Sequence, residues 1–528
     1  MKAFVRFLLL IGLISSTASI WAQAPNIYLA NTPSGGGDGS SCANARAWTW
    51  FNSGSNWGTG ASQIGPGTTV HLCGTITQAT GGSNGLIPQG SGASGNLITI
   101  KFEPGAILQA PYWGTGKGDE WTDANGAGIF FNNVSYFVVD GGGTASNADC
   151  NPTNAGNCGL TSTNGIIQDT ANGSALANQV DDVGIAIYGN SSNIEIKNLD
   201  ITDIMVHQNG SDSCNSQSQC AQWNGRYATD IDVDTTGTNI QIHNNFLSVA
   251  GKGVSTHSKG TVSVYNNYMN SHVWMMFVGG GLTFVYNNEW TDWANWEHPI
   301  NNYHQDGVHA FGNSGYNYFF YNNYVHGDMC PDHNCSVSAM FYNENDNPMY
   351  VFNNLVMIPN NAQSQPSAWK NNGGQNYLYN NTFVNTQPTQ GVSVFYDGGT
   401  GSNPPLTSEN NVGTAQTSTL PVYSNGGSSP SCAVSDYNVW YNFGSNGCSE
   451  GSHSTTSNPN LNTDGLLQSG SPAIGRGANL TSLCVGNLAS LCLDKAGNPR
   501  PATGAWDSGA YQFNVGLAPP KNVLATAH

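Results

Sequence analysis

A short alternating segment that ends in Asn-Asn recurs along the chain, and it constrains the fold more than any other feature. The clear copies lie at residues 240–245, 262–267, 284–288, 319–323, 350–354 and 377–381, after a degenerate copy at 194–198. From Asn244 to Asn380, the first asparagines of successive copies are separated by 22, 21, 35, 31 and 27 residues. A period of this length is typical of one turn of a solenoid with variable loops.

The repeated segments have the properties of β-strands. They are four to six residues long, rich in β-branched and aromatic residues, and alternate with period two. A strand this short cannot bury its apolar face alone, but stacked copies can. A second set of such segments precedes the Asn-Asn pairs, at 229–234, 253–257, 272–277, 307–311, 338–342 and 392–396. We therefore predict coils of parallel strands with a triangular cross-section.

The repeated asparagines have a structural explanation. Asparagine tolerates the left-handed backbone conformation at a corner. Its side-chain amide can also bond to the asparagine of the next coil and so form a ladder. We interpret these asparagines as corner residues and not as ligands.

The composition excludes several classes of protein. With 14 Lys+Arg against 32 Asp+Glu, the net charge is −18, so the chain lacks the basic surface of a nucleic-acid binder. Helical bundles use more Glu, Lys and Arg than this chain contains. Hydrophobic residues at 38% and aromatic residues at 10% suffice for a core, which argues against disorder.

The N-terminal residues 1–24 have the pattern of a secretory signal peptide. Lys2 and Arg6 precede an apolar run at 7–14, and Ala22-Gln23-Ala24 offers a cleavage site. No later stretch is apolar enough to span a membrane. We expect a soluble protein that is secreted or periplasmic.

The twelve cysteines fit export, because disulfides persist in oxidising compartments. Their close spacing favours local disulfides over free buried thiols, and the lack of a CxxC pair disfavours zinc. The expected pairs are Cys150/Cys158, Cys214/Cys220, Cys330/Cys335, Cys432/Cys448 and Cys484/Cys492, with Cys42/Cys73 left over.

Three further motifs carry a family resemblance. The first is the opening 27–30 with the Gly-rich 34–40, the second is 64–72, and the third is the ending 471–474, 497–501 and 507–511. With the repeat, they make the chain resemble the right-handed parallel β-helix proteins of the pectin-lyase-like superfamily.

The resemblance implies an all-β, right-handed parallel β-helix solenoid over 25–515, with an asparagine ladder and loops on one face. Residues 516–528 would be a tail or the start of a linker, and the protein a monomer. The superfamily contains lyases, hydrolases, epimerases and non-catalytic surface proteins, so the resemblance does not imply one reaction.

The largest excursion of the repeat, between Asn288 and Asn322, suggests a ligand site. It carries three of the 14 tryptophans within seven residues, and flat aromatic rings can stack on sugars. Packing of these rings against the solenoid wall is the alternative. The expected substrate-binding residues are Trp274, Trp293, Trp296, Tyr303 and His304.

Strand alternation predicts a row of polar groups on the outer surface. If Val308 and Ala310 point inward, His309 points outward and Asp306 lies near the start of the strand. The same rule turns Asp230, Asp232, Asp234 and His257 outward. Stacked strands lie about 4.8 Å apart, so with Trp274 the row would span roughly 15 Å. The predicted catalytic residues are Asp306, His309, His257, Asp232 and Asp234.

Two reactions use such a row. Glycoside hydrolysis needs two carboxyls around one bond, here Asp306 with Asp232 or Asp234. Uronate β-elimination needs a cation on the sugar carboxylate and a base. The cation could be Ca²⁺, the one cofactor that this reaction suggests, held by Asp230, Asp232 and Asp234. The base could be His309 or His257, with Lys252 and Lys259 as alternatives. Histidines beside aspartates could instead hold a transition metal.

The sequence thus predicts an extracellular polysaccharide-binding protein that cleaves its ligand by hydrolysis or β-elimination. The alternative is a non-enzymatic, adhesin-like carbohydrate-binding solenoid. A net charge of −18 attracts polyanions poorly unless bound cations screen it. The charge therefore favours a neutral glycan or a Ca²⁺-dependent lyase.

Overall fold

The computed structural model describes fourteen segments of the chain. They are residues 26–113, 126–142, 163–171, 182–204, 228–293, 305–312, 315–328, 337–344, 347–358, 367–386, 393–398, 404–416, 421–424 and 431–513. The predicted signal peptide, the tail at 516–528 and three of the expected cysteine pairs (Cys150/Cys158, Cys214/Cys220 and Cys330/Cys335) lie outside these residues.

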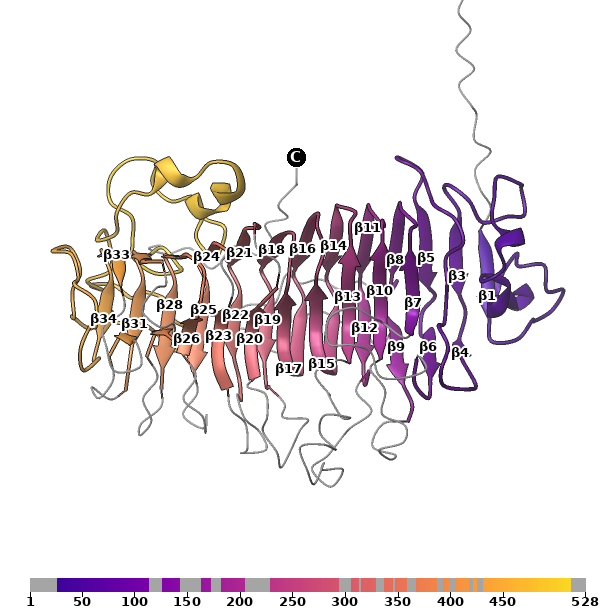
Figure 1. Cartoon of the computed structure of the whole chain (residues 1–528), viewed down its shortest axis with the longest axis horizontal. Helices are drawn as coiled ribbons and strands as arrows, with labels where there is room; N and C mark the ends of the chain where they lie inside the picture. The colour runs from indigo at the N-terminus through magenta and orange to yellow at the C-terminus, as the bar shows by residue number, and fades with distance from the viewer. Residues whose placement is uncertain are drawn as a thin grey trace, which may run out of the picture.

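The chain forms a right-handed parallel β-helix, as predicted, and its strands succeed one another along the long axis (Figure 1). A 14-stranded parallel sheet makes the first face. Its strands are β1 (Ile27–Ala30), β2 (Arg46–Ala47), β3 (Thr69–Leu72), β5 (Ile98–Phe102), β8 (Phe137–Asp140), β11 (Ile194–Lys197), β14 (Ile240–His243), β16 (Thr261–Tyr265), β18 (Leu282–Tyr286), β21 (Tyr318–Tyr321), β24 (Met349–Phe352), β27 (Asn376–Tyr379), β30 (Leu406–Glu409) and β33 (Cys432–Asp436).

A 20-stranded sheet makes the other two faces, because β15 and β17 bend through both. The second face contains β4 (Thr75–Thr77), β6 (Ile107–Ala110), β9 (Gly165–Asp169), β12 (Leu199–Thr202), the first halves of β15 (Phe246–Thr256) and β17 (Tyr268–Val278), β19 (Glu289–Thr291), β22 (Tyr324–His326), β25 (Leu355–Ile358), β28 (Thr382–Asn385), β31 (Val412–Thr414) and β34 (Val439–Tyr441).

The third face carries the candidate site. It contains β7 (Ala127–Asn132), β10 (Val183–Gly189), β13 (Thr229–Thr235), the second halves of β15 and β17, β20 (Gln305–Ala310), β23 (Val337–Asn343), β26 (Ser367–Asn371), β29 (Phe395–Asp397) and β32 (Tyr423–Ser424). The described helices are short 3₁₀ segments: η1 (Cys42–Asn44), η2 (Trp48–Trp50), η3 (Gly54–Asn56), η7 (Thr481–Leu483) and η8 (Gly486–Cys492).

The alternating residues fill the interior of the solenoid. Ile242 pairs with Val264, Val264 with Val285, and Val285 with Phe320, and all four side chains are fully buried. Burial of one such side chain contributes about 1.5–3 kcal/mol. Stacking the repeats therefore supplies the core that no single strand could form.

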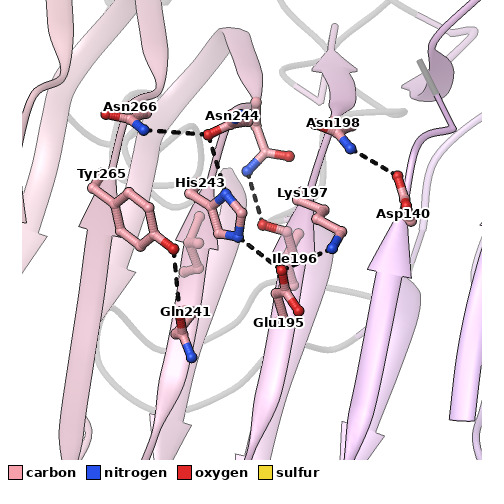
Figure 2. Close-up of polar contacts among 12 residues, drawn as sticks. Asp140, Glu195, Ile196, Lys197, Asn198, Gln241, His243, Asn244, Tyr265 and Asn266 are labelled. Carbon is pink, nitrogen blue, oxygen red and sulfur yellow. Dashed lines mark hydrogen bonds and ion pairs between the residues drawn. The ribbon is translucent and has the colours of Figure 1, made fainter. Parts of the chain in front are cut away.

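The two asparagines of each pair have different roles. The first has a left-handed backbone, with φ between 52° and 59° from Asn244 to Asn380, so it makes the corner. The second is buried and forms the predicted ladder. In Asn267, for example, Nδ2 donates to Asn288 Oδ1 at 3.0 Å, while Oδ1 accepts from Asn245 Nδ2 at 3.0 Å. Figure 2 shows the corner side, where Asn266 reaches Asn244.

A polar cluster lies on the outer surface of the first face (Figure 2). Glu195 Oε1 accepts from Lys197 Nζ at 2.9 Å and lies 3.0 Å from His243 Nε2. Tyr265 stacks on His243 with 4.6 Å between ring centroids. The bond to His243, followed by that to Lys197, outweighs desolvation and lowers the pKa of Glu195 from 4.5 to about 2.

This shift predicts a pH-dependent contribution to stability. A carboxyl whose folded pKa is depressed stabilises the fold above its unfolded pKa, and the contribution is lost as pH falls towards the folded pKa. We expect Glu195→Gln to lower the free energy of unfolding at pH 7 by about 1–2 kcal/mol, after allowing for solvent screening. Urea unfolding at pH 7, 5 and 3 should show this difference shrinking below about pH 4.5. A difference that stays constant over this range contradicts the assignment.

The C-terminal part of the chain folds back over the first face, where Figure 1 shows it in yellow. Leu480, Leu491 and Trp506 pack against the aromatic rings of β21, β24 and β27. Arg500 is buried and donates to Asn353 Oδ1 at 2.9 Å. This segment covers a face other than the third, so it does not contact the candidate site.

Three expected disulfides are confirmed: Cys42–Cys73, Cys432–Cys448 and Cys484–Cys492. They are consistent with an oxidising, extracytoplasmic compartment. In the part of the chain that the structure describes, no helix is long and apolar enough to cross a membrane.

Candidate functional site

The third face brings together side chains from strands far apart in sequence. One residue from each strand lies opposite the next, and we call this line the His309 row. In order along the solenoid, the row consists of Asp232, Ser255, Phe277, His309, Tyr342, Lys370 and Tyr396. Neighbouring members are one strand spacing apart, about 4.8 Å.

Strand alternation sets the direction of this row. Val233 and Ala310 are fully buried in the apolar core, so Asp232 and His309, which precede them, point to the outer surface. Asp306 lies three residues before His309, next to an irregularity in the pairing of β20 with β23 between Gln305 and Asp306. The two side chains nevertheless contact each other.

His309 lies between two carboxylates. Its Nδ1 is 3.1 Å from Asp306 Oδ2, and its Nε2 is 2.8 Å from Glu344 Oε2. Glu344 directly follows β23. The exposed fractions of the three side chains are 0% for Asp306, 7% for His309 and 32% for Glu344. Glu344 is therefore the member of this triad that a ligand can reach.

The electrostatics of the triad favour a charged imidazole. Burial opposes the imidazolium, but the hydrogen bonds and charges of Asp306 and Glu344 outweigh it, so the pKa of His309 is raised above its ordinary value. The imidazolium can then donate to both carboxylates. Asp306 Oδ1 also accepts the backbone N–H of Ala339 at 3.0 Å, which fixes its carboxylate in place.

Aromatic rings surround His309. Ring centroids of Trp274, Tyr342 and Phe277 lie 4.8, 4.9 and 5.8 Å from that of the imidazole. Desolvation raises the pKa of Tyr342, so its phenol stays protonated, and Asn372 donates to its oxygen. Phe311 is 38% exposed beside them. With these rings around it, the imidazole is only 7% exposed, so solvent reaches the triad mainly at Glu344.

Two lysines contact the same rings. Lys252 Nζ lies 4.9 Å from the centroid of the Phe277 ring, and Lys370 Nζ lies 4.3 Å from that of Tyr342. Such cation–π contacts contribute about 0.5–2 kcal/mol each. Lys252 is 4% exposed, whereas Lys370 is only half-buried.

Asp232 and His257 lie on the same face but at a distance from the triad. The hydroxyl of Tyr188 donates to Asp232 Oδ2. Desolvation lowers the pKa of His257 to about 4, against the opposing charge of Asp232, so its imidazole is neutral at pH 7. These residues form a neighbouring polar group and not part of the triad.

The expected carboxylate pairing is wrong. In the register Asp306 lies opposite Thr229 across three strands, so Asp232 is about 14 Å away across the sheet and three residues further along β13. Asp234 is two residues further along β13. Paired glycosidase carboxyls are about 5–9.5 Å apart, so Asp306 cannot act with Asp232 or Asp234 on one bond.

The expected outward direction of Asp230 is also wrong. Asp230 is fully buried and bonds His272 Nε2 at 2.7 Å. A Cβ built on Gly253, in the same position of the next strand, would lie 3.2 Å from the sulfur of the buried Met269. This position therefore faces the interior, and Asp230 cannot join Asp232 and Asp234 around one cation.

The described residues contain no group of three or more His, Cys, Asp or Glu side chains placed to hold a metal ion. The Ca²⁺ site suggested by Asp230, Asp232 and Asp234 is thus not formed by those side chains.

The described tryptophans do not form the exposed sugar-binding surface that the sequence suggests. Trp293 is fully buried in the core, and its Nε1 donates to the backbone oxygen of Asp306 at 2.9 Å. Trp274 is 3% exposed. Trp293 therefore holds the backbone of Asp306, and Trp274 packs beside the ring of His309. The other predicted substrate-binding residues, Trp296, Tyr303 and His304, lie outside the described residues.

Glu344, Tyr342 and Lys370 were not predicted as site residues. Aligning the segments 307–311 and 338–342 by their buried residues would have placed Tyr342 opposite His309 and Glu344 beyond it. The strand β26, which carries Lys370, was not predicted at all, because its sequence Ser-Ala-Trp-Lys-Asn lacks the alternating pattern.

Comparisons with known proteins give neighbours of low similarity. No family model and no curated protein matches the chain. Among solved structures, pectate lyase Pel9A has 13% identity and a TM-score of 0.39, over 93% of this chain and 97% of its own. An alginate lyase from Paenibacillus sp. str. FPU-7 has 13% identity and a TM-score of 0.38, over 63% and 92%. The surface protein and adhesin PfbA of Streptococcus pneumoniae has 10% identity and a TM-score of 0.33, over 74% and 91%.

These values assign neither a reaction nor a ligand. The assignment of the fold rests on the strand pairing, and the assignment of a site rests on the triad.

Proposed function

We propose that this protein is an extracytoplasmic enzyme that cleaves a polysaccharide on its third face by general acid–base chemistry. The observation that carries the proposal is the His309 imidazole, held between the buried Asp306 and the half-exposed Glu344. Burying this ion-paired relay is costly, because even paired charges lose their hydration, and titratable groups perturbed in this way cluster at functional sites.

Each member of the triad has a distinct role. Glu344 is the catalytic residue, because it alone reaches the surface and can exchange a proton with a ligand. His309 stabilises the Glu344 carboxylate and holds a proton behind it. Asp306 is a positioning residue that fixes the ring of His309, in the way that a buried carboxylate orients a histidine in other acid–base sites.

The geometry favours β-elimination over hydrolysis. Hydrolysis needs a second carboxyl on the opposite side of the scissile bond. Asp306 cannot supply it, because its side chain is fully buried behind the ring of His309. Elimination needs one base near the acidic carbon–hydrogen bond, which Glu344 can provide, and a cation on the sugar carboxylate.

A glycan panel tests this proposal. Purified protein is incubated with neutral and uronate-containing polysaccharides, and both reducing ends and unsaturated uronate absorbance are measured. We expect new reducing ends together with unsaturated product from a uronate polymer. Reducing ends without unsaturation would indicate hydrolysis. Binding without any release of product would contradict the proposal and support the adhesin-like alternative.

A further inference from the structure

We infer that Lys370 is a specificity-determining residue that binds the carboxylate of a sugar next to Glu344, so that the substrate is an acidic glycan. This inference rests on the proposed function and adds to it the residue that recognises the carboxylate of the substrate.

The position of Lys370 in the strand register carries the inference. Lys370 lies opposite Tyr342, and Glu344 follows Tyr342 by two residues on the same side of the chain. Lys370 and Glu344 are therefore diagonal neighbours, with Cα atoms about 8 Å apart. One sugar ring can span this gap, with its carboxylate towards the lysine and a ring carbon towards the glutamate.

The environment of Lys370 fixes its ammonium group. The group lies 4.3 Å over the Tyr342 ring, and Asn372 binds the phenol of the same residue. A lysine held by an aromatic ring loses less side-chain entropy on binding a ligand than a lysine in open solvent does. Lys370 is half-buried, so its charge acts in a medium of lower dielectric constant than water.

The overall charge makes a local cation necessary for an anionic ligand. The chain has only 14 Lys and Arg residues and a net charge of −18. Long-range attraction of a polyanion is therefore poor, and binding must depend on short-range contacts. Lys252, which also contacts the described rings of this face, is 4% exposed and less able to reach a ligand.

The reaction that follows is balanced. The Glu344 carboxylate takes the proton from the ring carbon that bears the sugar carboxylate. The electron pair of that C–H bond forms a C=C bond to the neighbouring carbon, and the bond from that neighbour to the glycosidic oxygen breaks. Protonated Glu344 returns the proton to the leaving oxygen. Lys370 neutralises the sugar carboxylate, whose charge would otherwise oppose loss of the proton.

The experiment compares Lys370→Ala and Lys370→Arg with the wild type on a polyuronate and on the same polymer after reduction of its carboxylates to alcohols. Lys101→Ala is the matched control, because Lys101 is likewise half-buried and lies in β5 on the first face, away from the triad. We expect wild type and Lys101→Ala to cleave the polyuronate alike and to leave the reduced polymer intact. Lys370→Ala should lose about 10²-fold in kcat/KM, and Lys370→Arg should retain part of the activity.

A binding measurement separates a role in recognition from a role in folding. Isothermal titration of Glu344→Gln with uronate oligosaccharides should show at least about tenfold weaker binding when Lys370→Ala is added. Unchanged binding and unchanged kcat/KM in Lys370→Ala, with wild-type cleavage intact, would overturn this inference and leave the proposed function standing. A wild type that cleaves the reduced polymer equally well would overturn this inference and β-elimination together, because the reduced polymer has no acidic carbon–hydrogen bond and must be cleaved by hydrolysis. If the wild type cleaves no glycan, the proposed function fails and this inference with it.

Discussion

Glu344→Gln is expected to reduce the rate of glycan cleavage by about 10²–10⁴-fold, because the amide cannot exchange a proton with the substrate. The amide keeps the size of the side chain and can still lie beside His309 Nε2. Thermal unfolding should therefore show little loss of stability. Steady-state kinetics on the cleaved glycan, with protein concentration matched by absorbance, measure the effect.

Asp232→Asn is the matched control for this variant. It removes a carboxylate from the same face, three strands from His309. We expect less than about a fivefold change in kcat, because Asp232 cannot reach the bond that Glu344 acts on. Loss of activity in Asp232→Asn together with full activity in Glu344→Gln would support the catalytic role of Asp232 predicted from sequence. It would contradict the catalytic role of Glu344 and its triad.

Asn267→Ala is expected to lower the free energy of unfolding by about 3–5 kcal/mol. Its Oδ1 accepts the backbone N–H and the side-chain amide of Asn245, each at 3.0 Å. Its Nδ2 donates to Ile242 O and to Asn288 Oδ1, also at 3.0 Å. Alanine removes the buried acceptor of the Asn245 backbone N–H and the buried donor to Ile242 O, whereas Asn288 Oδ1 keeps the backbone N–H of this position as a donor. Urea unfolding monitored by tryptophan fluorescence provides the measurement.

The neighbouring Asn266 gives the control for the ladder. It has φ of 55° and makes the corner, so Asn266→Gly keeps the backbone conformation without strain. We expect a change within about 1 kcal/mol. Equal effects of the two variants would mean that the second asparagine has no special role in the ladder.

Local patterns predicted the fold well, for a physical reason. A strand of four to six residues with period two must bury one side, and a repeat every 21–35 residues can do so only by stacking. The corner and ladder roles of Asn266 and Asn267 follow from the same geometry. These features depend on residues close together in sequence, so one sequence suffices to find them.

The site was predicted less well, because it depends on register between distant strands. Alternation placed His309, Asp232 and also Asp230 on the outer surface. Asp230, however, occupies the same strand position as Gly253, which faces the interior, so its side chain is buried. A shift of one residue exchanges the two sides of a strand. Glu344 contacts His309 although 35 residues separate the two in sequence. Because the loops vary in length, the sequence does not show that these two residues meet.

The pH dependence of kcat/KM, measured for the wild type and for Asp306→Asn, tests the triad most directly. Asp306 helps to raise the pKa of His309, so the wild type should lose activity only as pH rises beyond the ordinary histidine value of about 6.5, where the imidazolium loses its proton. Asp306→Asn removes one of the two charges that favour the imidazolium, and the alkaline limb should move to lower pH while some activity remains. An alkaline limb at the same pH in both proteins would contradict the proposed relay.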